Sequence, residues 1–216
     1  MPLGYIRALT LLHRTFRRHP PAQRAHVLGR FLSTPLLRAL DLIPAGSCVL
    51  DIGAGHGVVS RLIAEQSASA VVAVDPDLRK VLNAYAHPRV RFVAGYDDCV
   101  RGQFDAITIF DVINRMPSDV RDALFRHAYA LLRPGGVLLV KDLDPSARIK
   151  AGWNRLQERV ADLLRMSVGE YTENESREQF AERMARAGFV DFRWKRIDFG
   201  YPHAHIIYTG RKKEEG

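Results

Sequence analysis

The fold of this chain is decided by the stretch Val49-Leu50-Asp51-Ile52-Gly53-Ala54-Gly55-His56-Gly57. An apolar run ends in an acid and then breaks into three glycines at alternate positions. We expect a buried strand over residues 48–52, a tight turn through the glycines and a helix that begins near Val58. Glycine adopts positive φ without a Cβ penalty and lets the backbone approach a ligand closely. The stretch therefore predicts a strand–turn–helix unit that holds a ligand at its turn.

The glycine spacing and the acid indicate which ligand this is. In the dinucleotide fingerprint G-x-G-x-x-G the third glycine comes one position later, where this chain has Val58. A carboxylate at Asp51 would repel a pyrophosphate but suits a cationic ligand. The run resembles motif I, (D/E)-x-G-x-G-x-G, of the class I S-adenosylmethionine-dependent methyltransferases. The resemblance implies that the cofactor contacts Asp51, Gly53, Ala54, Gly55 and Gly57. The alternative is a glycine-rich turn without a ligand.

A second acid follows the next predicted strand. Residues 70–74 form a short apolar run that ends in Asp75, roughly 20 residues past Gly53, the distance at which an acid binds ribose hydroxyls in βαβ nucleotide sites. Two carboxylate oxygens facing two hydroxyls make charge-assisted hydrogen bonds. We therefore place Asp75 and its neighbour Pro76 at the cofactor. The alternative is that Asp75-Pro76-Asp77 only forms a turn.

Residues 90–94 predict the third strand. In the methyltransferase family an acid after this strand commonly meets the adenine amino group. Asp97 and Asp98 are the candidates here, because Tyr96 follows the glycine where the family usually has its acid. A solvated turn is the alternative for each.

Residues 104–110 predict the fourth strand, with Asp111 and Val112 at its carboxyl end. Ligands of open α/β sheets bind outside the carboxyl ends of the strands, so we expect both residues near the methionine end of the cofactor. Many relatives carry Glu-His or His-His a few positions later, whereas this chain has Asn114-Arg115. A general base is therefore not evident from this loop.

The candidate catalytic residues are Asn114, His203 and His205. An imidazole titrates near neutrality and can deprotonate a hydroxyl, although a lone histidine is more often structural. For the substrate, the candidates are Lys141, at the end of the fifth strand, and Trp153 with Asn154 in a helical insertion at about residues 145–175. The alternative for Trp153 is a place in the core of that helix.

The remaining pattern extends the first unit to a whole domain. Helices are predicted over residues 118–132, with Ser118 as N-cap, and 176–188, with a capping box; strands are predicted over 137–140, 190–197 and 205–209. We expect an α/β fold, a doubly wound Rossmann-like seven-stranded mixed sheet with helices on both faces. This domain covers residues 45–210. An N-terminal helical cap covers residues 1–44, and a charged tail covers 211–216.

The basic character of the chain, net charge +8, lies in its first part. Residues 1–40 hold seven arginines and no Asp, Glu or Lys. In a helix over residues 3–18 the apolar side chains share one face and the arginines lie opposite. The apolar set is Tyr5, Leu9, Leu12 and Phe16, and the basic set is Arg7, Arg14 and Arg18. Three roles fit: a cap packed on the domain, peripheral contact of residues 1–40 with an anionic membrane, or nucleic-acid binding.

Cysteine content and hydropathy indicate the cellular compartment of the protein. Cys48 and Cys99 have no metal-ligand spacing, so we predict no metal site and a reduced, cytoplasmic protein. No apolar run is long enough to span a bilayer, and no signal peptide is evident. The sequence leaves the oligomeric state undetermined.

The resemblance implies direct in-line transfer of the methyl group from the sulfonium of S-adenosylmethionine. We expect a small-molecule acceptor, apolar or lipid-like, because the basic amphipathic segment adjoins a nearly neutral domain. One alternative is an RNA methyltransferase that holds phosphates with its arginines. Another is a protein that binds the cofactor without turnover, although the intact acids Asp51, Asp75 and Asp111 argue against a decayed site.

Overall fold

The computed structural model describes residues 3–67, 69–77, 79–80, 86–95, 103–144 and 175–214. Four predicted site residues lie outside the described residues: Asp97, Asp98, Trp153 and Asn154. The predicted insertion helix lies outside them as well.

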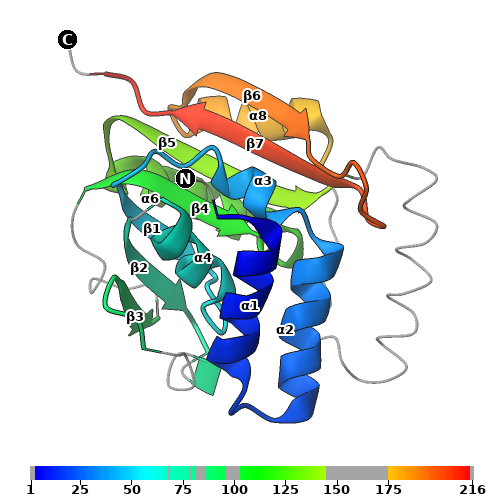
Figure 1. Ribbon diagram of the computed structural model, residues 1–216. Coiled ribbons are helices and arrows are strands. Elements are labelled where there is room, and N and C mark those ends of the chain that lie inside the picture. Colours follow the sequence, from blue (N-terminus) through cyan, green and yellow to red (C-terminus); the bar gives the residue numbers. More distant parts are fainter. Residues whose placement is uncertain are drawn as a thin grey trace.

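A seven-stranded sheet forms the centre of the molecule, in the order β3-β2-β1-β4-β5-β7-β6 (Figure 1). Its strands are β1 (Cys48–Ile52), β2 (Ala70–Asp75), β3 (Val90–Ala94), β4 (Phe104–Phe110), β5 (Leu132–Leu143), β6 (Val190–Arg196) and β7 (His205–Arg211). Strands β1 to β5 are parallel to one another, and β7 runs antiparallel to both β5 and β6. The predicted doubly wound seven-stranded mixed sheet is confirmed.

The strand order reverses at β1, which pairs with β2 on one side and with β4 on the other. Ligands of open α/β sheets bind at such a reversal, beyond the carboxyl ends of the strands. Both neighbours of β1 are apolar runs buried on their two faces, as parallel strands covered by helices usually are. The topology therefore places the glycine turn after β1 where a ligand is expected.

Helices cover both faces of the sheet (Figure 1). One face carries α1 (Tyr5–Phe16), α2 (Pro21–Ser33), α3 (Leu36–Leu40) and α4 (Val58–Gln66), and the other carries α6 (Ser118–Leu131) and α8 (Arg177–Arg186). The buried apolar side chains form two clusters, one on each face. In the described part of the chain, no helix is long and apolar enough to cross a membrane.

The N-terminal helices share a core with the sheet. Leu12 and Phe16 of α1 and Phe31 of α2 are at most 1% exposed and cluster with α4. Tyr5 lies at the edge of this contact, 41% exposed, with its ring centroid 5.0 Å from that of Phe31. The apolar stripe predicted for α1 therefore packs largely against the domain, and the arginines stay outside.

Two local predictions need correction. Ser118 is the first residue of α6 and does not cap it; its hydroxyl instead accepts a hydrogen bond from Arg183 Nη2 at 2.9 Å. Strand β5 begins at Leu132 and not at Val137, since Leu132 already pairs with Phe104 of β4, and after a register shift the regular pairing resumes at Val137. The capping box of α8 is confirmed, with Gln179 N donating to Ser176 Oγ and Ser176 N donating to Gln179 Oε1.

Candidate cofactor and acceptor site

The turn after β1 requires glycine for two separate reasons. Gly53, Gly55 and Gly57 have φ values of +76°, +57° and +78°, which L-residues with a side chain rarely adopt. A Cβ at Gly53 would lie 2.4 Å from Val112, and one at Gly57 would lie 2.5 Å from the ring of Phe92. The turn is therefore held close to the strands on both of its sides. This contact also brings Val112, a predicted cofactor residue, beside the turn.

Asp75 joins the turn to the end of β2. Its Oδ2 accepts a hydrogen bond from Gly55 N at 2.8 Å, and its Oδ1 accepts one from Asp77 N at 2.9 Å. The hydrogen bond from Asp77 N closes the Asp75-Pro76-Asp77 turn, which the sequence predicts as the alternative role of Asp75. Pro76, between them, is exposed. A carboxylate oxygen accepts more than one hydrogen bond, so Asp75 keeps capacity on both oxygens for a further donor.

Asp51 has a different environment from Asp75. It is 2% exposed, and its oxygens accept hydrogen bonds from Ser60 Oγ at 2.5 Å and Thr108 Oγ1 at 2.8 Å. Burial raises the pKa of Asp51 to about 6, while the two hydroxyl donors act in the opposite direction. These bonds tie β1 to α4 and to β4. The structure therefore gives Asp51 a bracing role behind the turn, and its contact with the cofactor stays a prediction.

Asp111 follows β4 in a left-handed conformation, φ +58°. Its Oδ1 accepts from Lys141 Nζ at 2.6 Å and its Oδ2 from Arg30 Nη2 at 3.1 Å. Burial alone would raise the pKa of Asp111, but Lys141 and Arg30 together hold it well below its ordinary range. Such a conformation for a non-glycine residue stores strain that often marks a functional site.

This ion pair changes the interpretation of two basic residues. Lys141, a predicted substrate contact, is fully buried and donates to Asp111 in this structure. In the sequence, Arg30 of α2 is distinguished only as one of the seven arginines of residues 1–40. No signal in the sequence links it to Asp111, since 81 positions separate the two residues.

Two candidate catalytic residues carry buried polar atoms that have no hydrogen bond within the described part of the chain. These are Asn114 Oδ1 and both ring nitrogens of His205. His205 is 2% exposed, and its pKa is lowered to about 3, by burial first and by Lys141 second. The backbone of Ser33 approaches the ring without a hydrogen bond of normal geometry. Buried polar groups are nearly always paired in native proteins, so these atoms call for a partner. His203 lies beside His205, with ring centroids 6.1 Å apart.

Asp142 is an acid that the sequence analysis missed. It is 7% exposed, and burial, followed by the nearby charge of Asp111, raises its pKa to about 7. Successive side chains of a strand point to opposite faces. Accordingly Lys141 lies opposite Ile207 of one core cluster and Asp142 opposite Ile206 of the other. The only sequence signal was its place at the carboxyl end of a predicted strand.

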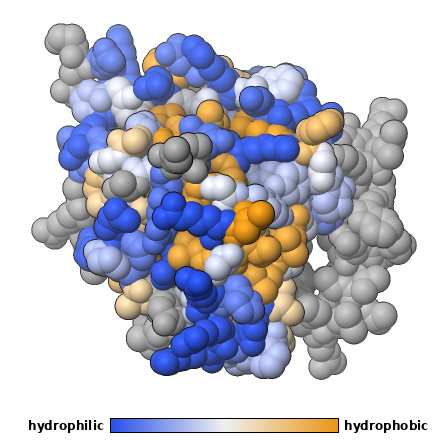
Figure 2. All heavy atoms as spheres, in the orientation of Figure 1, coloured by the Kyte–Doolittle hydropathy of each residue, from blue (hydrophilic) through white to orange (hydrophobic). Residues whose placement is uncertain are grey.

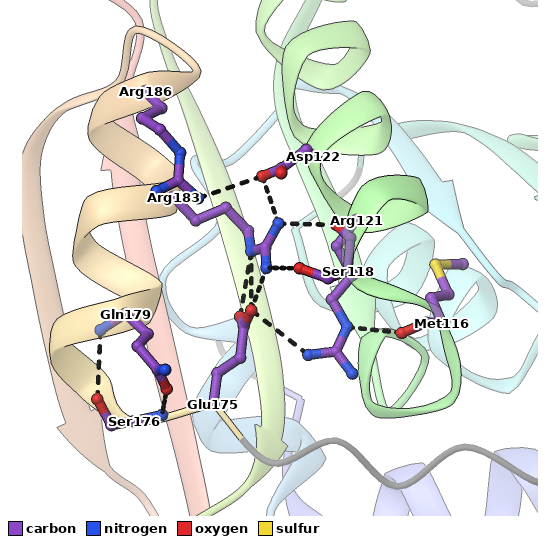
Figure 3. Close-up of polar contacts among 9 residues, drawn as sticks. All are labelled: Met116, Ser118, Arg121, Asp122, Glu175, Ser176, Gln179, Arg183 and Arg186. Carbon is purple, nitrogen blue, oxygen red and sulfur yellow. Dashed lines mark hydrogen bonds and ion pairs between the residues drawn. The ribbon is translucent and has the colours of Figure 1, made fainter.

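A buried polar network supports the loop after β4 (Figure 3). Arg121 of α6 is 1% exposed, and its Nε donates to Met116 O at 2.8 Å. Arg121 and Arg183 of α8 both approach Glu175, Arg121 at 3.5 Å and Arg183 through Nε at 3.1 Å. Two guanidinium groups thus share one carboxylate between α6 and α8. This network fixes the end of the loop that carries Asn114.

Among the described residues, no group of three or more His, Cys, Asp or Glu is arranged to hold a metal ion. The polar groups at the edge of the sheet where β1 to β5 end, and where β7 begins, divide into two sets. Asp75 and the glycine turn lie at β1 and β2. Asp111, Lys141, Asp142 and His205 lie at β4, β5 and β7, with Arg30 above them.

Comparison with known proteins gives consistent findings. The family model described as a methyltransferase domain matches residues 23–192. A ubiquinone biosynthesis O-methyltransferase of Xanthomonas axonopodis pv. citri is 34% identical over 112 residues, which are 48% of this chain and 46% of the relative. A 2-methyl-6-phytyl-1,4-hydroquinone methyltransferase of Synechocystis sp. is 25% identical over 179 residues, 76% of this chain and 52% of the relative. The chain spans about half the length of these two relatives.

The fold is also similar to that of solved structures. Human N-acetylserotonin methyltransferase in complex with S-adenosylmethionine superposes with a TM-score of 0.66 at 18% identity. The superposition covers 97% of this chain and 57% of the human chain. At this identity the likeness shows a shared fold.

Proposed function

Because this chain belongs to the methyltransferase domain family, among the class I S-adenosylmethionine-dependent methyltransferases, we propose that it methylates a small apolar acceptor of the hydroquinone type. The observation that carries the methyl-transfer part is the glycine turn bonded to Asp75 at the strand-order reversal. The acceptor class is supported by two similar proteins whose names refer to ubiquinone and to a phytyl hydroquinone.

The chemistry of the turn fits S-adenosylmethionine. Both oxygens of Asp75 have capacity left for ribose hydroxyls. Residues 51–58 include no Lys or Arg, as suits a ligand without phosphates. When bound, S-adenosylmethionine supplies a methyl group on a positively charged sulfur. Gly53, Ala54, Gly55 and Gly57 would hold it with Asp75, Pro76 and Val112, and Asp97 or Asp98 is proposed for the adenine.

The residues beyond β4 and β5 would position the acceptor. A displacement reaction needs the nucleophile held in line and water kept out. The Lys141–Asp111–Arg30 group joins two cations to one carboxylate and so ties α2 over the ends of β4 and β5. Asn114 Oδ1 and the ring of His205 have unused hydrogen-bonding capacity. We propose that they bind the hydroxyl of the acceptor, and that His203 borders the same region.

Calorimetric titration with S-adenosylmethionine tests the cofactor site. We compare the wild type with Asp75→Asn and with the matched control Asp77→Asn, whose side chain accepts exposed hydrogen bonds from Arg79. Losing charge-assisted hydrogen bonds worth about 1.5–3 kcal/mol should weaken binding roughly 10- to 100-fold in Asp75→Asn, and the control should stay within about twofold. A folded wild type that does not bind the cofactor would contradict the proposal.

A transfer assay with labelled cofactor tests the acceptor. The proposal expects methyl transfer to a short-chain hydroquinone and none to RNA. Transfer to RNA alone would replace the acceptor class by a nucleic acid. Cofactor binding without transfer to hydroquinones, phenols or amines would favour a binding protein without turnover.

A further inference from the structure

The outward face of α1 carries positive charge that the described part of the chain does not neutralise. Arg7, Arg14, Arg17 and Arg18 are exposed and make no hydrogen bond or ion pair with a described residue. Residues 1–40 contain no acid at all. In contrast, Arg38 of α3 donates to two backbone carbonyls. The charge on α1 is therefore available to a partner.

A groove of about 340 Å³ lies between α1 and the end of α4. Its lining residues are Leu3, Arg7, Thr10, Leu11, Arg14 and Glu65. Arg7, Thr10 and Arg14 follow one another along one face of the helix, while Leu3 and Leu11 supply apolar surface. Glu65, the acid in the groove, already pairs with His87 Nε2 at 3.1 Å. The groove thus combines two unpaired guanidinium groups with an apolar wall.

Apolar side chains are exposed on the same helix pair. Ile6 is 80% exposed, and Leu32 of α2 is 50% exposed beside Phe31, on which Tyr5 packs. Figure 2 shows hydrophobic surface over α1 and α2 and hydrophilic surface towards the turn that joins them. Arginine next to exposed aliphatic and aromatic groups is the composition that binds the interface of an anionic membrane.

We propose that the outward face of α1 docks on an anionic phospholipid surface, with a lipid phosphate between Arg7 and Arg14 and Ile6 in the interface. The outward face makes the contact in this arrangement, because Leu12 and Phe16 of the apolar stripe are buried in the domain. The same charge would attract RNA. However, the lining of the groove is aliphatic and basic, without the aromatic platform on which unpaired bases stack.

Vesicle sedimentation with the full chain tests the proposal. Vesicles contain either phosphatidylcholine alone or phosphatidylcholine with phosphatidylglycerol. The wild type should bind the anionic vesicles and not the neutral ones. The variant R7Q/R14Q should lose about 30-fold in partitioning, since each arginine near an anionic surface is worth about 1 kcal/mol, or roughly fivefold.

The control variant R126Q/R193Q removes the same charge from α6 and β6, where both arginines are exposed, and should stay within about twofold of the wild type. Equal losses in the two double variants would overturn the proposal, because binding would then follow net charge and not this face. Binding to RNA with no binding to anionic vesicles would also overturn it. Thermal unfolding confirms that both variants fold, and cofactor titration reports on the other site separately.

Discussion

The two halves of the site are built in different ways. At β1 and β2 the acids are bonded to groups close in the chain or in neighbouring strands: Asp75 to the backbone of Gly55, and Asp51 to two hydroxyls. At β4, β5 and β7 the Lys141–Asp111–Arg30 group joins three distant segments, and buried atoms of Asn114 and His205 have no hydrogen bond to a described residue.

This difference in hydrogen bonding means that the β1–β2 half is preformed, whereas the β4–β5–β7 half is incomplete. The β1–β2 half has its polar groups paired before any ligand arrives, so it presents one defined shape to one cofactor. The β4–β5–β7 half keeps unpaired atoms that cost free energy in the unliganded protein. Substitutions should therefore affect stability at the ion pair and the turn, and affect function alone at the unpaired atoms.

The largest loss of stability is expected for Lys141→Met. It leaves Asp111 with only Arg30, and breaking a buried ion pair by removing one partner costs about 3–5 kcal/mol. The matched control is Arg133→Met, which breaks an ion pair with Asp105 at 2.7 Å whose side chains are 50% and 34% exposed. That change should cost less than about 1 kcal/mol. Urea unfolding measures both, and equal costs would show that the buried pair has no structural role.

A slightly smaller loss is expected for Gly53→Ala. The new Cβ would clash with Val112 at 2.4 Å in a residue with φ +76°, and strain and overpacking each cost about 1–3 kcal/mol. We expect about 3 kcal/mol of destabilisation and loss of cofactor binding. Gly46→Ala is the control, because Gly46 has φ +73° and open space around it. If both variants lose the same stability, the loss comes from the positive φ that the two glycines share, and the contact with Val112 adds nothing to it.

Asp142→Asn should raise stability in a way that depends on pH. The folded-state pKa of about 7 lies above the ordinary value of 3.8, so between these values the folded protein binds more protons and wild-type stability falls as the pH rises. We expect the variant to equal the wild type near pH 4 and to exceed it by up to about 4 kcal/mol at pH 8. Urea unfolding at the two pH values measures this. If the difference in unfolding free energy between variant and wild type does not change with pH, the carboxyl group of Asp142 is solvated and the proposed burial effect is wrong.

His205→Leu should have the smallest effect on stability and a clear effect on function. Replacing an unpaired buried imidazole by an apolar side chain is close to neutral, so the unfolding free energy should change by less than about 1 kcal/mol. The KM for the acceptor should rise roughly tenfold, while cofactor affinity should not change. A large loss of stability would instead make His205 a structural residue.

Much of the fold follows from local sequence pattern. Strands β1, β3 and β4 and the start of α4 lie at the predicted residues, because apolar runs broken by glycines or polar turns specify them locally. β5 extends further than predicted, since Leu132 pairs with Phe104 of β4 ahead of a Pro-Gly-Gly run that has the local character of a turn, and regular pairing resumes at Val137.

By itself the sequence determined the β1–β2 half, because motif I and the acid after β2 are short contiguous segments whose geometry is set by the turn they form. Only the tertiary structure decided the β4–β5–β7 half. Arg30, Asp111, Lys141 and His205 come from four separate segments, and no periodicity or spacing relates them. Their charges and burial depend on how α2 packs over the ends of β4, β5 and β7, which is set by the whole core.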